Sequence, residues 1–225
     1  MDLFSKYKKE GWDFFDNYRC RIKVGTLVGG KPKNPELIEA WVNAKCKDKT
    51  EAERKRIRDA HVDTLDDEVD GQREKSAIGF ARVDGQLAIE GRQVKAMLKE
   101  AANIIKDKLP IKDGKISSLK SKVADQVFVV EEWIKLGRTD PDDVDERPIH
   151  VMTRQGPRDS LKVCEILRDV EIEFTVRRLS ASGKSSVPEK VLMAILDYAQ
   201  SIGLGADRSQ GAGVFEVLSV EKIEG

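Results

Sequence analysis

Apolar and polar residues alternate with a period of two in two stretches, which is the pattern of strands with one buried face. Between Asn17 and Val28, apolar side chains at 20, 22 and 24 alternate with basic ones at 19, 21 and 23. Val170 to Val176 shows the same alternation, with Glu171, Glu173 and Thr175 on the polar side. A final strand is predicted over about residues 214–220.

Other stretches carry a helical period. Apolar residues between about 92 and 109 recur at helical spacing, while Arg92, Lys95 and Lys99 line another face. A second clear helix is predicted after Ser186 and Glu189, which have the spacing of a capping box, and it ends at Gly203. Asn34 and Pro35 favour the start of an earlier helix, and a charged one is predicted over about 50–65.

The remaining segments are shorter or less regular. Strand-like pieces from Ile78 to Ile89 surround the turn Asp84-Gly85, and residues 127–136 are predicted as one strand. The acidic segments 63–74 and 140–147 are predicted as loops. This order of elements favours an α+β fold in which helices cover one face of an antiparallel sheet, as in split βαβ folds.

Composition bounds the class of protein. The chain has 225 residues, of which 40% are apolar, enough for a buried core but without an apolar run long enough to cross a bilayer. The first residues lack the apolar stretch of a secretory signal, so we expect a cytoplasmic protein. Cys20, Cys46 and Cys164 are scattered and odd in number, which predicts neither a disulfide framework nor a zinc site. No cofactor or metal is predicted.

The formal net charge is zero, but the charges are grouped. Residues 1–58 hold 15 basic and 9 acidic side chains, and residues 75–122 hold 11 and 5; residues 59–74 hold 1 and 7, and residues 123–147 hold 3 and 8. Such blocks place a basic face on a neutral protein, or else are solvated helix faces and acidic loops.

The segment from Ile202 to Phe215 is the most specific motif, with four glycines in eleven residues between a predicted helix and a predicted strand. Glycine permits positive φ and close backbone approach, and the intervening Arg208, Ser209 and Gln210 offer donors to phosphate or base. The alternative is a helix stop and a bulge without a ligand. The segment matches neither the dinucleotide-binding fingerprint nor a P-loop.

This glycine-rich loop before a terminal strand resembles the signature of the RAMP superfamily of CRISPR-associated RNA-binding proteins. Two further segments are similar to its repeating backbone subunits: Ile89 to Ala96, at the start of a helix, and Val151 to Arg158, which leads into the strand at 170–176. The three segments occur in the order of the family. The sequence departs from the family pattern at Glu90, where proline is usual, and at Ala96, where glycine is usual.

The resemblance implies one domain over residues 1–225 with a modified ferredoxin-like or RRM-like core, a helical insertion at about 34–74 and a hairpin thumb at about 148–163. It implies a subunit that coats single-stranded, guide-like RNA and stacks head to tail with other copies, with other effector-complex subunits as further partners. The residues expected to contact RNA are Arg19, Arg21, Arg92, Lys95, Lys99, His150, Met152, Arg154, Arg158, Gly205, Arg208, Ser209, Gln210, Gly211 and Gly213.

Two alternatives stay open at this stage. Some relatives cut RNA with an aspartate placed just before the segment that begins here at Ala77, and the nearest candidate is Asp70; others use a histidine, which leaves His61 and His150. A ribonuclease is therefore the second hypothesis. The third is a protein that replaces or blocks a subunit of such a filament, with the charge blocks as complementary surfaces.

Overall fold

Ten strands, four α-helices and a short 3-10 helix make up the part of the chain that the computed structural model describes, which is residues 14–33, 43, 49–59, 75–109, 118–153, 156–180 and 186–223. In chain order these are β1 (Phe15–Val28), β2 (Lys31–Pro32), α3 (Glu51–Asp59), β3 (Lys75–Gly79), β4 (Ala81–Val83), β5 (Gln86–Glu90), α4 (Gly91–Ile105), α5 (Leu119–Gln126), β6 (Val127–Val129), β7 (Trp133–Lys135), β8 (Asp143–Thr153), β9 (Gly156–Leu179), α6 (Glu189–Ile202), η1 (Arg208–Gln210) and β10 (Phe215–Ile223).

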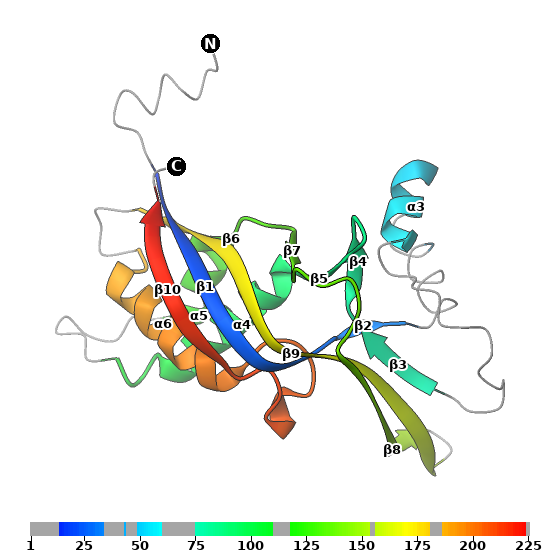
Figure 1. Cartoon of the computed structure of the whole chain (residues 1–225). Helices are drawn as coiled ribbons and strands as arrows, with labels where there is room; N and C mark the ends of the chain where they lie inside the picture. The colour runs from blue at the N-terminus through cyan, green and yellow to red at the C-terminus, as the bar shows by residue number, and fades with distance from the viewer. Residues whose placement is uncertain are drawn as a thin grey trace.

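The central sheet has the strand order β10-β1-β9-β6, and every neighbouring pair in it is antiparallel. Helix α4 precedes β6 in the chain, and α6 precedes β10, so two βα units interleave in the 4-1-3-2 order of a ferredoxin-like fold. Figure 1 shows α4, α5 and α6 on one face of this sheet. The predicted α+β class, with its helices on one face of the sheet, is confirmed.

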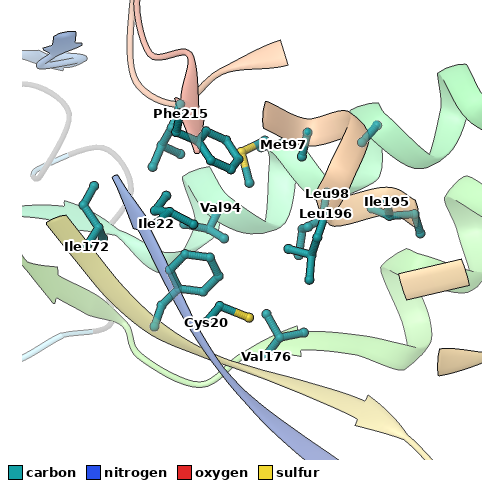
Figure 2. Close-up of a cluster of buried hydrophobic side chains, with 14 of the residues drawn as sticks. Cys20, Ile22, Val94, Met97, Leu98, Ile172, Val176, Ile195, Leu196 and Phe215 are labelled. Carbon is teal, nitrogen blue, oxygen red and sulfur yellow. The ribbon is translucent and has the colours of Figure 1, made fainter. Parts of the chain in front are cut away.

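The hydrophobic core lies between the sheet and these helices (Figure 2). Alternate residues of β1 and β9 enter it because successive side chains of a strand point to opposite faces. Burying each large apolar side chain contributes about 1.5–3 kcal/mol, so this layer holds the helices in place. The labelled core residues are Cys20, Ile22, Val94, Met97, Leu98, Ile172, Val176, Ile195, Leu196 and Phe215.

Strand β9 continues beyond the central sheet at its N-terminal half. Asp169 has a positive φ of 47° and separates the two halves. Residues 156–166 pair with β8 to form a hairpin that projects from the body at the lower right of Figure 1. Strand β3 pairs with the same part of β9 in parallel, so the extended sheet is mixed rather than purely antiparallel.

The segment 127–136 forms two short strands instead of the one predicted. Strand β6 pairs with β9, whereas β7 joins β5 and β4 in a separate three-stranded sheet. The chain bends between them around the start of α4, because the N–H of Gly91 donates to the carbonyl of Glu132 and a side chain at Gly91 would collide with the carbonyl of Glu131.

Two other local predictions were wrong. Residues 143–147, predicted as part of an acidic loop, are the start of β8, where pairing with β9 and an ion pair from Asp143 to Arg168 offset their low strand propensity. The capping box at Ser186 is not formed: α6 begins after Pro188 without a side-chain cap, since Gln126 binds the N–H of Val187 and thereby holds the preceding segment. A capping box forms instead between Thr50 and Glu53, at the start of α3.

Most of the predicted insertion at 34–74, including the helix expected after Asn34 and the acidic loop at 63–74, lies outside the described residues. Helix α3 is the part of it that the structure describes as an element, apart from the single residue 43. None of the described helices is long and apolar enough to span a membrane.

Candidate nucleic-acid interface

A pocket of about 500 Å³ opens between the N-terminus of α4 and the bend that joins β6 to β7. Its lining combines two basic side chains with aromatic walls and three glutamates. The cations and rings suit a nucleotide because phosphates attract cations and bases stack on rings. The lining residues are Glu90, Gly91, Arg92, Lys95, Phe128, Val129, Val130, Glu131, Glu132 and Trp133.

Arg92 is the accessible cation of this pocket. Its side chain is 76% exposed and is held at Nε by the carboxylate of Glu90. Glu90 is itself buried and accepts a second ion pair from Lys31, whose ammonium lies 5.4 Å from the ring centre of Trp133. The buried carboxylate therefore holds Arg92 at Nε, and the two terminal nitrogens of the guanidinium are further donors.

Lys95 lies one turn further along α4 and is half-buried. Its ammonium donates to the carbonyl of Val123 at 2.8 Å, to that of Ala124 at 2.9 Å and to that of Val127, so it caps the end of α5. It also lies 4.9 Å from the ring centre of Phe128. Burial, together with a smaller effect of the nearby charge of Lys99, lowers the pKa of Lys95 from 10.5 to about 8.

Phe128 and Trp133 form the aromatic walls. Phe128 is 41% exposed on the short strand β6, and its ring meets Phe15 edge to face at 6.2 Å. Arg177, the register partner of Phe128 on β9, places its guanidinium 5.6 Å from the ring centre of Phe15. The pocket thus continues from β6 across β9 to β1 as an aromatic and basic surface, which we call the β6 surface: Phe15, Phe128, Arg177 and the pocket residues.

Sequence reasoning selected Arg92 and Lys95 but missed Phe15, Phe128, Trp133 and Arg177. In a continuous strand over 127–136, Phe128 and Trp133 would point to opposite faces, because their positions differ by an odd number. The bend at residues 130–132 brings both to one pocket, and it depends on packing against Gly91.

The glycine-rich loop packs its backbone onto the end of β1. The N–H of Ala206 donates to Val28 at 2.9 Å, and the N–H of Gly213 donates to Thr26 at 2.7 Å. Gly205 and Gly213 both have positive φ, and a side chain at either would collide with a backbone carbonyl, of Val28 and Leu204 respectively. Close backbone packing therefore accounts for these two glycines. Gly211 also has a positive φ, with open space around it.

The donors predicted on this loop are joined to other elements. Arg208 binds Glu100 of α4 at 2.7 Å, and Gln210 accepts from Arg147 at 2.7 Å, while Ser209 is exposed. Asp207, at a positive φ of 55°, accepts from both Arg147 and Lys162 at 2.5 Å. The loop thus connects α4 to the β8–β9 hairpin.

Arg19 and Arg21 lie on the open face of the sheet, away from α4, and strand alternation places Phe15 and Arg177 on this same face. Each pairs diagonally with an acid of β9: Arg19 with Glu173 at 3.7 Å and Arg21 with Glu171 at 3.0 Å. Lys23 continues this ladder with Asp169 at 3.4 Å. The acids neutralise the basic row of β1, so this face offers less attraction to phosphate than its arginines alone suggest.

The remaining predicted contacts are spread over the hairpin and α4. His150, Met152 and Arg158 lie in the strands of the hairpin, opposite Asp159, Pro157 and Val151, and Arg154 lies outside the described residues. Lys99 is half-buried one turn after Lys95 on α4. The structure therefore brings Arg92, Lys95 and Lys99 to one helix and the loop residues to the hairpin, but separates Arg19 and Arg21 from both.

The candidate catalytic residues Asp70 and His61 lie outside the part of the chain that is described. Within the described part, no group of three or more His, Cys, Asp or Glu side chains is placed to hold a metal ion.

The chain was compared with protein families, curated proteins and solved structures. No protein-family model matches its sequence, and no curated protein does. Among solved structures, it is similar to a chain of the cryo-EM structure of the Type III-B Cmr-beta bound to cognate target RNA, with a TM-score of 0.43 and 13% sequence identity. The alignment covers 99% of this chain and 64% of that chain, so the protein spans just under two thirds of its neighbour's length.

Proposed function

We propose that this protein binds single-stranded RNA through the pocket at the start of α4. The observation that carries the proposal is the position of Arg92 beside the exposed ring of Phe128, in a pocket of about 500 Å³ with Trp133 on its wall. A base stacks on Phe128, and Arg92 neutralises an adjacent phosphate. Stacking is tolerant of sequence because every base has a flat aromatic face.

The β6 surface extends this site beyond one nucleotide. Arg177 presents an exposed guanidinium next to Phe15, and guanidinium planes stack on bases as aromatic rings do. A strand that leaves the pocket along β6 thus meets a second cation and a second ring. The self-neutralised ladder of Arg19 and Arg21 is the weaker candidate surface.

The resemblance to the RAMP backbone subunits extends the proposal to the kind of RNA and to partners. On that basis the RNA is a guide-like strand, the glycine-rich loop and the hairpin contribute further contacts, and copies of the chain stack head to tail or join other effector-complex subunits. An interface between unlike surfaces does not close on itself and gives filaments. The structural neighbour is RNA-bound, but a TM-score of 0.43 is too low for that likeness to support the function.

Fluorescence anisotropy with a labelled single-stranded RNA at several salt concentrations tests the site. Phe128→Ala removes the stacking surface and is expected to cost about 1–3 kcal/mol of binding. Leu218→Ala is the matched control, since Leu218 is 42% exposed on β10 at the opposite edge of the sheet. Equal affinity of the parent and the Phe128 variant, in a folded protein, would rule out the pocket as the RNA site.

Light scattering with the absorbance ratio at 260 and 280 nm tests the assembly. The proposal predicts a high-mass species with nucleic acid that shrinks on ribonuclease treatment. A nucleic-acid-free monomer would contradict the coating of RNA by stacked copies.

A further inference from the structure

Lys95 is placed to act on RNA through another residue rather than by touching it. Its three ammonium protons match three carbonyl acceptors at the junction of α5 and β6, those of Val123, Ala124 and Val127. An ammonium has three donors and no acceptor, so these bonds use its whole capacity. A phosphate would have to displace one of them.

The same ammonium contacts the face of Phe128 at 4.9 Å from the ring centre. Phe128 directly follows the last of the three carbonyl-bearing residues, on a strand of only three residues that is paired to β9. A cation held on one face of an aromatic ring is attracted by the negative charge of that face, and more strongly when it is shielded from water. Lys95 therefore holds both the backbone that carries Phe128 and the ring itself.

We propose that Lys95 is a positioning residue that presents Phe128 as the base-stacking surface, and that it makes no phosphate contact of its own. The inference rests on the proposed RNA-binding function of the pocket. It names Lys95 as the residue that holds Phe128 in the position for stacking on a base. The two cations of the pocket then have different roles: Arg92 contacts the phosphate, and Lys95 supports the ring of Phe128.

Proton loss from Lys95 weakens this support. The neutral amine has two N–H donors for three carbonyls, and it no longer places a charge on the ring of Phe128. The charged groups around the ammonium are Lys99 of α4 and Asp125 of α5, with Arg92, Glu90, Glu131 and Glu132 in the same pocket. Since the pKa of Lys95 is about 8, RNA affinity is expected to fall as the pH rises from about 7 to about 9.

The contribution of Lys95 to folding stability changes in the opposite direction over this pH range. The pKa of Lys95 is about 8 in the folded protein and 10.5 when unperturbed, so between these values the unfolded chain binds more protons. Folding stability from this residue consequently rises with pH. A loss of RNA binding in this window is therefore not unfolding caused by Lys95.

The test compares Lys95→Met with the parent in salt-dependent binding of an RNA made only of adenine and cytosine, because guanine and uracil lose ring protons in the alkaline range. Lys95→Met is expected to bind about 10-fold more weakly with an unchanged salt slope, and Phe128→Ala is expected to add no further loss to it. A slope smaller by about 0.7 would mean a phosphate contact and would overturn the proposal, as would additive losses.

Two further variants test whether the pH dependence comes from the charge of Lys95. Lys95→Arg carries a cation that does not titrate, so its affinity stays flat from about pH 7 to about pH 9 while that of the parent falls. A parallel fall in this variant would overturn the proposal. Lys120→Met, at an exposed position of α5, is the matched control and leaves both the affinity and its pH dependence unchanged.

Hydrogen exchange without RNA distinguishes failure of this inference from failure of the proposed function. Lys95→Met is expected to raise amide exchange over β6 and the end of α5, and Lys120→Met is not. If the parent ignores RNA, the proposed function fails, and with it the role in stacking, whatever the exchange shows. If the parent binds RNA but exchange and affinity are untouched by Lys95→Met, the inference alone fails.

Discussion

Lys162 of the β8–β9 hairpin lies 2.5 Å from Asp207 of the glycine-rich loop, through its Nζ and the Oδ1 of the aspartate. Arg147, from the other strand of the hairpin, binds the second carboxylate oxygen at the same distance. One largely buried carboxylate thus joins both strands of the hairpin to the loop. The relative placement of these two candidate RNA contacts depends on this aspartate.

Asp207→Asn is expected to lower the free energy of unfolding by about 1–3 kcal/mol, because charge-assisted hydrogen bonds to two partly buried cations are lost. Urea denaturation measures it. Asp145→Asn serves as the control, since Asp145 is more exposed and lies 3.8 Å from Arg147, and is expected to cost less than about 1 kcal/mol. Equal losses in the two variants would show that Asp207 does not connect the elements.

Gly213→Ala is expected to destabilise the protein by more than about 2 kcal/mol, because it adds a collision with the carbonyl of Leu204 to the strain of a positive φ. Gly211→Ala isolates the second effect, since Gly211 has a similar φ of 87° and open space around it. A cost of about 1 kcal/mol is expected there. Thermal unfolding measures the stability of both variants. An equal loss of stability in Gly213→Ala and Gly211→Ala would refute the close packing of the loop.

Asp16→Asn tests a buried ion pair with a pH dependence. Burial by itself would raise the pKa of Asp16, but the hydrogen bond from Lys222 and the charge of Arg178 hold that pKa below its ordinary value of 3.8. This carboxylate therefore contributes stability above pH 3.8 that is lost as the pH falls through its folded pKa.

At neutral pH the Asp16→Asn variant is expected to lose about 2–3 kcal/mol, since the buried Arg178 keeps its bond to Val187 and its contact with Tyr18 but loses its carboxylate partner. The difference from the parent shrinks as the pH is lowered towards acid unfolding. Asp84→Asn, which removes an exposed pair with Lys135, is the control and has a much smaller effect. A loss that did not depend on pH would contradict this assignment.

Arg92→Ala and the double variant Arg19→Ala/Arg21→Ala compare the two candidate surfaces for RNA. Removing Arg92 is expected to reduce the slope of log affinity against log salt by about 0.7, the value for one phosphate on a single strand. The double variant leaves its slope nearly unchanged, because Glu171 and Glu173 already neutralise those arginines. A larger change of slope in the double variant would place the RNA along Arg19 and Arg21 of β1 rather than at the pocket.

Much of the fold could be predicted because its main elements each bury one face. The alternation around Cys20 and Ile172 and the helical spacing around Leu98 and Ile195 follow directly from burial on one side. Helix α5 was missed, since eight residues with only Leu119 and Val123 buried are too short to show a period. The break between β6 and β7 was missed because it is caused by a contact with Gly91, about 40 residues earlier in the chain.

The candidate site was predictable only in part. Arg92 and Lys95 are visible as basic positions at a helix start, and their placement in one pocket agrees with that pattern. Their different roles are not visible in the sequence, because the spacing of two cations on a helix does not show which of them donates hydrogen bonds to backbone carbonyls. The same limit applies to Arg19 and Arg21, which sequence shows as a basic row but which pair with a strand about 150 residues away.

The sequence by itself determined the α+β class, the strands and helices of the core and the positive-φ glycines of the loop, because each depends on local periodicity or on a backbone conformation special to glycine. Only the tertiary structure decided which charges are free. In it, the basic side chains of β1 pair with acids of β9, and Lys95 donates to carbonyls at the end of α5. Asp207 binds the hairpin, and Phe128 lines the same pocket as Arg92. Net charge in a sequence is a sum over residues, whereas attraction for a ligand depends on which charges remain unpaired at one surface.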